Sequence, residues 1–449
     1  MSALLQKLNS QQKEAVTLPN ISSLILAGAG SGKTRVLTTR IAWLIDGGKI
    51  TPNGILAVTF TNKAAKEMSL RISNMLPVST RGMWIGTFHG ICNRLLRLHF
   101  KDANLPKSFQ ILDSNDQISI IKRVIKLNKI DIEKISPKQI QYHINSAKDN
   151  GLRSNQIDEV DEFTQHVNKV YRIYQNICDV EGLVDFGELI LRTYELFKNN
   201  NALREHYQNR FKYLLVDEFQ DTNQLQYNWL RLLVSKSNSI FAVGDDDQSI
   251  YGFRGARSDN LSDFKRDFNV SNTVKLEQNY RSQGHILEAA NALIKNNVNR
   301  LGKDLWTSSG QGEQIKVLEA PSESEEANSI VREIKRLESH DHKLEDIAIF
   351  YRSNAQSRPL EQALFRAGIA YKVYGGLRFF ERQEIKHALA YLRLILNPQD
   401  HSSFLRIINF PPRGIGSKSI EKINKISEIK KCSLFEALSF TDLSGKAAA

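Results

Sequence analysis

Apolar residues follow two alternating patterns along the chain. Short apolar runs, "SLILAG" (23–28) and "GILAVTF" (54–60), are separated by "KTRVLTTRIAWLI" (33–45), whose apolar positions recur at helical spacing. Further strand-like runs occur at "YLLVDEF" (213–219) and "SIFAVGD" (239–245). Buried strands that alternate with helices are typical of a parallel α/β sheet. The sequence therefore predicts such a sheet, with strands from two separate stretches of the chain, 23–60 and 213–245.

Between these strand patterns the chain changes character. From about 90 to 210 the apolar positions follow a helical period among many Lys, Asn and Gln residues, most clearly in "KVYRIYQNICDVEGLVDFGELILRTYELF" (169–197). We therefore expect a helical block inserted into the α/β domain. A second α/β pattern covers about 273–374, and from about 378 the chain is helical again. The strands expected in that second pattern are "TVKLEQ", "QIKVLEA", "DIAIFY" and "AYKVYG".

Length and composition narrow the class of protein. A chain of 449 residues suggests two to four domains, and 41% hydrophobic with 24% charged residues is the balance of a soluble globular protein. No apolar run approaches the roughly 20 residues of a membrane-spanning helix, and the N-terminus reads as an amphipathic helix, not a signal peptide. Cys92, Cys178 and Cys432 lie far apart and form neither a disulfide framework nor a zinc pattern. We therefore expect a cytoplasmic protein with no membrane partner.

The charge suggests a partner. Sixty-one Lys and Arg residues against 49 Asp and Glu residues give a net charge of +12. Such an excess favours a polyanion, most simply nucleic acid. Solubility alone is the other explanation, and composition does not decide between the two.

The segment "LILAGAGSGKTRV" (24–36) follows a predicted strand and opens a predicted helix, which is the context of a phosphate-binding loop. Its glycines allow backbone amides to surround phosphate oxygens at a helix N-terminus: Gly28, Gly30 and Gly32. Lys33 would reach the β- and γ-phosphates, and Thr34 would ligate Mg²⁺. The usual pattern has glycine where this chain has Ala27. A glycine-rich turn with a chance lysine is the alternative.

Two carboxylates follow the strand pattern "YLLV" at the start of "YLLVDEFQDTN" (213–223). Asp217, at the end of the strand, would hold Mg²⁺ through water, and Glu218 would orient and deprotonate the attacking water. An ordinary strand end explains such a pair equally well when it is taken alone. The phosphate-binding loop is what favours the catalytic interpretation.

The segment "GDDDQSIYGFRGA" (244–256) combines an amide, aromatic rings and guanidinium groups. Gln248 would contact the γ-phosphate or the attacking water at the edge shared with the other two strands. Tyr251 and Phe253 would stack on nucleic-acid bases, and Arg254 and Arg257 would meet the adjacent phosphates. The alternative is that the two rings pack under a loop.

These segments, with others in the same order, resemble the UvrD/Rep/PcrA family of superfamily 1A helicases. The resemblance runs nearly end to end, from "LNSQQKEAV" to "RGIGSKSIEKI", and includes "AVTFTNKAAKEM", "WIGTFHG", "LEQNYRS" and "IAIFYRSNAQSR". It implies catalytic roles for Lys33, Glu218, Gln248 and Arg281, the last as an arginine finger. It implies nucleotide contacts at Gln12, Ala27, Gly28, Ala29, Gly30, Ser31, Gly32, Lys33, Thr34, Arg35, Tyr280 and Arg281, with metal ligation by Thr34 and Asp217. It implies DNA contacts at Phe60, Thr87, His89, Tyr251, Phe253, Arg254, Arg352 and Asn354.

The resemblance also implies an architecture: RecA-like P-loop NTPase sheets of α/β class with inserted all-helical subdomains. The expected division is a 1A ATP-binding subdomain (1–88 and 211–277), a helical 1B insertion (89–210), the first part of a second RecA-like subdomain 2A (278–376) and a partial helical 2B (377–449). The implied activity is ATP- and Mg²⁺-dependent 3′→5′ translocation on single-stranded DNA and unwinding of 3′-tailed duplex DNA, in mismatch and nucleotide excision repair.

The sequence departs from the family pattern in two places. The family usually has Trp where this chain has Phe253, and its last two motifs have no match here, so the sequence reads as an N-terminal portion with incomplete 2A and 2B. Two alternatives stay open. One is the motor of a recombination helicase–nuclease, which would need a nuclease carboxylate–lysine cluster. The other is a fragment that only binds ATP and DNA.

Overall fold

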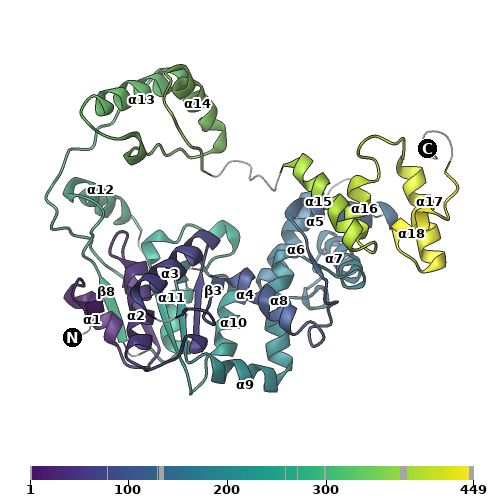
Figure 1. Cartoon of the computed structure of the whole chain (residues 1–449), viewed down its shortest axis with the longest axis horizontal. Coiled ribbons are helices and arrows are strands. Elements are labelled where there is room, and N and C mark those ends of the chain that lie inside the picture. Colours follow the sequence, from purple (N-terminus) through teal and green to yellow (C-terminus); the bar gives the residue numbers. More distant parts are fainter. Residues whose placement is uncertain are drawn as a thin grey trace. The chain divides into compact units, whose positions relative to one another are not determined.

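The computed structural model describes residues 3–77, 79–128, 130, 136–257, 259–270, 272–297, 300–374 and 382–443, except for the side chains of Arg254 and Ser417. The chain divides into two compact units, Met1–Gln314 and Ile315–Ala449. Each unit is described by itself (Figure 1).

The first unit is built on a parallel six-stranded sheet with the strand order β3-β2-β6-β7-β1-β8. All five strand pairings are parallel. The four strands expected from the first part of the sequence are all present, so the prediction of a parallel α/β sheet is confirmed. The strands are β1 (Ser23–Ala27), β2 (Ile55–Thr59), β3 (Trp84–Thr87), β6 (Tyr213–Val216), β7 (Ser239–Gly244) and β8 (Asn272–Leu276).

Alternation along the strands buries both faces of the sheet. In β1, Leu24 and Leu26 belong to one apolar cluster, and Ile25 and Ala27 belong to the other. This follows from the period of two in a strand, which sends successive side chains to opposite faces. The first cluster packs under helices that include α4, α8 and α10, and the second under α1, α2 and α3. Two covered faces explain why the strands read as continuous apolar runs.

The helices of the first unit are α1 (Ser10–Thr17), α2 (Lys33–Asp46), α3 (Asn62–Met75), α4 (Phe88–Leu98), α5 (Ser114–Leu127), α6 (Pro137–Asp149), α7 (Glu162–Glu181), α8 (Phe186–Asn199), α9 (Asn201–Arg210), α10 (Gln224–Leu233), α11 (Asn260–Asp267) and α12 (Gly284–Ile294). Helices α4 to α9 lie between β3 and β6 in the chain, so the helical insertion is confirmed. Within it α5, α6 and α7 form a separate apolar cluster, beside the short strands β4 (Gln110–Ile111) and β5 (Leu183–Val184).

The longest helical pattern of the sequence, 169–197, proves to be two helices. Gly182 has a left-handed backbone and ends α7, and the Asp185 side chain accepts a hydrogen bond from the Glu188 amide and begins α8. Glycine adopts that conformation without the steric penalty of a Cβ atom. The apolar spacing continues across the break because both helices face buried surroundings, so periodicity alone does not reveal it.

The second unit contains six helices among its described residues: α13 (Glu323–Glu338), α14 (Ser357–Arg366), α15 (Gln383–Leu396), α16 (His401–Ile407), α17 (Ser417–Lys430) and α18 (Leu434–Leu438). Helices α13 and α14 share a small apolar cluster, and the last four helices share another. The helical pattern expected after about 378 is therefore confirmed. Throughout the described ranges, no helix combines the length and apolar character that crossing a bilayer requires.

Three expected strands are not formed. Of the second α/β pattern, only "TVKLEQ" becomes a strand, and it pairs with β1 as β8, the edge of the first sheet. The segments 314–320, 346–351 and 370–374 have no strand assignment, and Gly375 lies outside the described residues. A strand exists only through hydrogen bonds to a neighbour, and these segments have none of that kind here. The prediction of strands at these three segments, which rested on their β-branched and aromatic composition, is therefore wrong for this structure, because composition does not supply a pairing partner.

Candidate functional site

Three neighbouring strands place their polar segments at one edge of the sheet. Strand β7 pairs with β1 on one side and with β6 on the other. The predicted phosphate-binding loop follows β1, Asp217 follows β6, and Asp245 follows β7. Because parallel strands share the edge at which they end, ligands of open α/β sheets bind there. The tertiary structure thus assembles segments that lie far apart in the sequence.

The phosphate-binding loop has the backbone shape its glycines predict. Gly30 and Gly32 adopt left-handed φ angles of 70° and 88°, and Gly32 begins helix α2. A Cβ atom on Gly28 would lie 2.1 Å from Leu305 Cδ2, so a larger residue there would require the Leu305 side chain to move. Ser31 donates a hydrogen bond to the Gly28 carbonyl across the loop (2.7 Å). The turn therefore presents backbone amides at a helix N-terminus, the geometry that binds anions.

The Lys33 ammonium is buried beside Glu218, a catalytic candidate. Its Nζ lies 3.1 Å from Glu218 Oε2 as an ion pair, yet the ammonium makes no hydrogen bond to any described group. A buried donor without an acceptor is costly, by about 1–3 kcal/mol and more for a charge. A phosphate oxygen would satisfy it.

The two carboxylates after β6 lie in different environments. Asp217 is buried, and burial, followed by the Glu218 charge, raises the pKa of Asp217 to about 7, while Lys33 opposes the rise. Glu218 has a left-handed φ of 49°, unusual for a residue with a side chain. Such strain is found where the surrounding structure imposes a functional orientation. The backbone turn separates the two side chains, with Glu218 the more exposed of the pair.

Gln248 joins the same constellation through side chains that the sequence did not single out. Its Nε2 donates to Asp245 Oδ2. The Asp245 amide donates to Gln220 Oε1 (2.9 Å), and Gln220 Nε2 donates to Glu218 Oε2 (2.9 Å). An unbroken polar path therefore joins Gln248 to Lys33. Gln220 was not predicted, although its place two residues after Glu218 in a polar strand end was a signal.

Two of the predicted nucleotide contacts, Gln12 and Arg35, bind the loop and the N-terminal segment. Gln12 is buried, accepts from the Asn9 amide and donates to the Ser31 carbonyl (2.9 Å). Arg35 donates to the Lys7 carbonyl (2.8 Å). Both side chains therefore tie the N-terminal segment to the phosphate-binding loop in this structure. Their contact with a nucleotide stays a prediction.

Tyr280 and Arg281 lie against the loop. The Tyr280 amide donates to the Gly30 carbonyl (2.9 Å), and Asn279 Nδ2 donates to the Ala29 carbonyl (2.6 Å). A Cβ atom on Gly30 would lie 2.8 Å from Arg281 Cβ. The arginine predicted to act as a finger is thus adjacent to the loop. Asn279 was not predicted, and it is the residue that anchors the segment.

The residues present fit a nucleotide with its metal ion. The buried ammonium of Lys33 lacks a hydrogen-bond acceptor, and Asp221 Oδ1 is likewise buried with no partner among described groups. Burial, followed by the Glu218 charge, raises the pKa of Asp221 to about 6, with Lys33 opposing. Oxygen ligands such as Asp217 and Thr34 are those that Mg²⁺ prefers. A phosphate oxygen could accept a hydrogen bond from Lys33, and a metal ion or its water could satisfy Asp221.

The predicted base-stacking side chains form a row. Phe60 stacks on Tyr251 with ring centroids 5.1 Å apart, and Tyr251 is 5.9 Å from Phe253 at a tilt of 44°. Phe253 is 74% exposed, so it does not pack under a loop. Arg257 donates to Gln224, and the Arg254 side chain lies outside the described part. The row begins only three residues beyond Gln248, and its own role stays a prediction.

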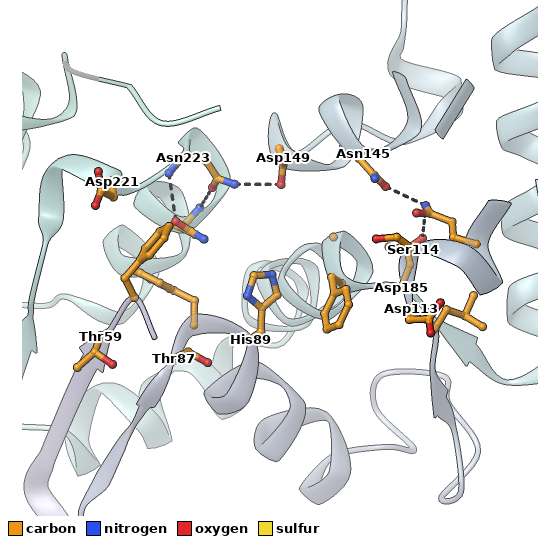
Figure 2. A pocket seen from close by; sticks show the side chains of 17 residues that line it. Thr59, Thr87, His89, Asp113, Ser114, Asn145, Asp149, Asp185, Asp221 and Asn223 are labelled. Atoms are coloured by element: carbon orange, nitrogen blue, oxygen red, sulfur yellow. Dashed lines mark hydrogen bonds between the residues drawn. The ribbon is translucent and has the colours of Figure 1, made fainter. Parts of the chain in front are cut away.

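Thr87 and His89 line a cavity of about 340 Å³ (Figure 2). The His89 ring packs edge-on against Phe186 with centroids 5.7 Å apart, and burial lowers the pKa of His89. Asn223 donates to Asp149 across the cavity wall (3.0 Å). Burial, followed by the charge of Asp185, raises the pKa of Asp149 to about 6. The wall contains residues that sequence reasoning missed: Asp149, Asn223 and Phe186.

Two predicted DNA contacts, Arg352 and Asn354, belong to the second unit. Asn354 begins a short 3₁₀ helix (Asn354–Gln356), and the Arg352 amide donates to Gln356 Oε1 (2.9 Å). Their role stays a prediction, as does the division into subdomains.

Comparison with known families gives two adjacent matches. Residues 8–269 match the UvrD/REP helicase N-terminal domain, and residues 274–442 match the UvrD-like helicase C-terminal domain. Together they cover nearly the whole chain. The first match ends shortly before β8, and the second begins within β8.

Relatives of known name are similar over the same span. The chain is 52% identical to DNA helicase II of Escherichia coli (strain K12) over 97% of its own length and 61% of the relative's. It is 51% identical to DNA helicase II of Salmonella typhimurium, covering 100% of this chain and 63% of that one. It is 44% identical to the ATP-dependent DNA helicase PcrA of Staphylococcus aureus (strain Mu50), covering 99% and 61%. The chain thus spans about three-fifths of these relatives' length.

Proposed function

The chain belongs to the UvrD/REP helicase family, and on that premise we propose that it is the ATP-hydrolysing motor of a DNA helicase. One observation carries the proposal. The phosphate-binding loop, the Asp217–Glu218 pair and Gln248 meet at one sheet edge, and a row of aromatic rings starts three residues further on. Gln248 at the nucleotide site and the rings of Tyr251 and Phe253 thus lie on one short segment, which is suited to couple ATP hydrolysis to DNA.

The nucleotide is bound by the loop and by Lys33. Backbone amides of the loop surround the phosphates, and the Lys33 ammonium takes phosphate oxygens as its missing acceptors. Thr34 and Asp217 would hold Mg²⁺, which when bound neutralises phosphate charge and orients the terminal group. Asp217 would hold the metal ion through its carboxylate form, and burial raises the pKa of this carboxyl group to about 7.

Hydrolysis depends on groups that act on water and on developing charge. Glu218 is placed to accept a proton from the attacking water, with Gln220 holding one of its oxygens. Gln248 is on the same polar path and orients either the water or the γ-phosphate. Arg281, beside Gly30, supplies the positive charge of an arginine finger, a contribution worth about 10³–10⁵ in rate in P-loop enzymes.

DNA is bound along the aromatic row and the cavity beside it. Exposed rings stack on bases of any sequence, and the net charge of +12 attracts the phosphates. Translocation from 3′ to 5′, unwinding of 3′-tailed duplexes and service in mismatch and nucleotide excision repair are proposed from the family. A cytoplasmic location is proposed too, supported by three free cysteines.

Measuring ATP hydrolysis by this chain with and without a single-stranded oligonucleotide tests the proposal. We expect hydrolysis that single-stranded DNA stimulates and that Glu218→Gln abolishes, the variant serving as the control for contaminating enzymes. Hydrolysis with no response to DNA would contradict a DNA motor. Binding of ATP and DNA without turnover would favour a protein that only binds them. Duplexes with 3′ and 5′ tails, compared in a strand-displacement assay, test the direction.

A further inference from the structure

One segment outside the predicted motifs touches three parts of the nucleotide site. We call residues 300–306 the strap. At its start, Arg300 and Lys303 contact the three aspartates that follow β7. Further on, the Leu305 side chain lies against Gly28 of the phosphate-binding loop. At its end, Trp306 exchanges backbone hydrogen bonds with Glu277 (3.1 Å) and Asn279 (2.7 Å), next to Tyr280 and Arg281.

Lys303 occupies the centre of the aspartate cluster. Its Nζ lies 2.6 Å from Asp245 Oδ1, 2.5 Å from Asp246 Oδ1 and 2.9 Å from Asp247 Oδ2. Lysine is rarely buried unless it is paired, and the Lys303 side chain is only 2% exposed. Burial by itself lowers the pKa of Lys303, but the three carboxylates outweigh it and the pKa is raised. The ammonium therefore stays charged at pH 7 and occupies the space among the three carboxylates.

Arg300 reinforces the contact from the side. Its Nε and Nη2 donate to the two oxygens of Asp247 (2.8 and 2.9 Å), a bidentate pair. The same Nη2 donates to the Lys303 carbonyl (2.9 Å), and the Leu301 amide donates to Asp246 Oδ2 (2.8 Å). Two cations thus face three anions, and a backbone amide adds a further bond. Without the strap, three adjacent carboxylates would repel one another.

The aspartates in turn orient the groups that act in hydrolysis. Asp245 accepts from Gln248 Nε2 through one oxygen and pairs with Lys303 through the other. The Asp245 amide leads through Gln220 to Glu218. Lys303 is therefore separated from Gln248 by the Asp245 side chain alone, and Asp245 is the residue through which it joins the polar path.

We propose that Lys303, supported by Arg300, is a positioning residue for ATP hydrolysis, which holds the aspartate segment so that Gln248 faces the nucleotide. The proposal rests on the proposed ATPase function. Lys303 touches neither the loop amides nor Lys33, so its loss leaves nucleotide binding largely intact. Loss of the contact frees Asp245 to turn, and Gln248 turns with it. Misplacement of a reacting group by about 1 Å can lower a rate by about 10²-fold.

The test compares Lys303→Met, which keeps the chain length but removes the charge, with Lys295→Met, an exposed lysine at the end of α12. In the full chain with saturating single-stranded DNA, Lys303→Met should lower kcat for ATP by about 10- to 100-fold, with KM changed less than about threefold. Lys295→Met should match the wild type. A rise in KM with unchanged kcat, or unchanged kinetics, would overturn the proposal.

Hydrogen–deuterium exchange separates this proposal from the ATPase proposal. In Lys303→Met the amides of 245–249 and of the strap should exchange faster, while those of β1 and β6 should not. A wild type without DNA-stimulated ATP hydrolysis would contradict the ATPase proposal. Unchanged amide exchange at 245–249 in Lys303→Met would overturn the positioning role, whatever the result for hydrolysis. If Lys303→Met does not fold, Arg300→Gln replaces it, with a smaller expected loss in kcat of about 3- to 10-fold. Wild-type kcat in a folded Arg300→Gln would also overturn the proposal.

Discussion

Replacing Phe253 with alanine should weaken DNA binding much more than it lowers the stability of the fold. The ring is 74% exposed, so only about a quarter of it is covered by the protein. Full burial of a phenylalanine stabilises by about 1.5–3 kcal/mol, so Phe253→Ala should lower the free energy of unfolding by only about 0.4–0.8 kcal/mol. A base stacked on the ring contributes about 1–3 kcal/mol, which corresponds to about 5- to 150-fold in the dissociation constant for single-stranded DNA. The effect on DNA binding should therefore exceed the effect on stability.

Fluorescence anisotropy with a labelled oligonucleotide measures the affinity for single-stranded DNA. Thermal unfolding followed by circular dichroism measures the stability of the fold. We expect weaker DNA binding with a melting shift below about 3 °C, and basal ATP hydrolysis near the wild-type rate. Phe253→Trp should bind DNA at least as well as the wild type, because the larger ring keeps the stacking surface. Phe365→Ala is the matched control, since Phe365 is a phenylalanine of similar exposure, 79%, in α14. Unchanged DNA affinity, or a large melting shift in Phe253→Ala, would refute the stacking role.

Three further predictions concern the nucleotide site and the helical insertion. Lys33→Ala should weaken nucleotide binding and abolish turnover, because Lys33 contacts the phosphates. Glu218→Gln should keep nucleotide binding but lose at least about 10²-fold in hydrolysis, because Glu218 acts on water. Titration with a fluorescent ATP analogue measures nucleotide binding. Lys148→Met should lower the free energy of unfolding by about 3–5 kcal/mol, measured in urea, because it leaves the Asp185 carboxylate buried without its cation, 2.7 Å away. Asp149→Asn should stabilise the chain, and more at pH 7.5 than at pH 5 by about 1–1.5 kcal/mol.

The sign of the last prediction follows from the pKa shift. The pKa of Asp149 is about 6 in the folded chain against 3.8 in the unfolded one. The unfolded chain therefore binds fewer protons between these values, and the carboxylate destabilises the fold increasingly as pH rises through that window. Asparagine keeps the acceptor for Asn223 and removes the charge. An equal difference in stability between Asp149→Asn and the wild type at pH 5 and pH 7.5 would contradict this prediction.

Equal loss of nucleotide affinity in Lys33→Ala and Glu218→Gln would contradict the separate roles of these two residues. An unchanged urea midpoint in Lys148→Met would contradict the role of the Lys148–Asp185 ion pair.

Local patterns determined the first sheet and its phosphate-binding loop. Strands β1, β2, β6 and β7 could be read directly, because strands covered by helices on both faces are continuous apolar runs. The loop could be read as well, since a glycine-rich turn between a strand and a helix has few other uses. Family resemblance added Gln12 and Arg281. The same signals failed for 314–320, which has the composition of a strand but no pairing partner in the described structure.

Contacts between distant segments could not be read from sequence. Gln220, Asn279 and Lys303 are ordinary polar residues in their own neighbourhoods. Each gains its importance from a group brought beside it by the sheet: Asp245 for Gln220, Ala29 for Asn279, and the three aspartates for Lys303.

The sequence by itself thus determined which chemistry the chain carries, because helical and strand periods, glycine turns and motif spacing are local properties of the backbone. Only the tertiary structure decided which side chains complete that chemistry. The order β6-β7-β1 places three chain segments at one sheet edge, and burial there makes a missing partner costly for every charge. Hence Lys33 has an ion pair with Glu218 but no hydrogen-bond acceptor among the described groups, whereas Lys303, 2% exposed, is surrounded by three carboxylates.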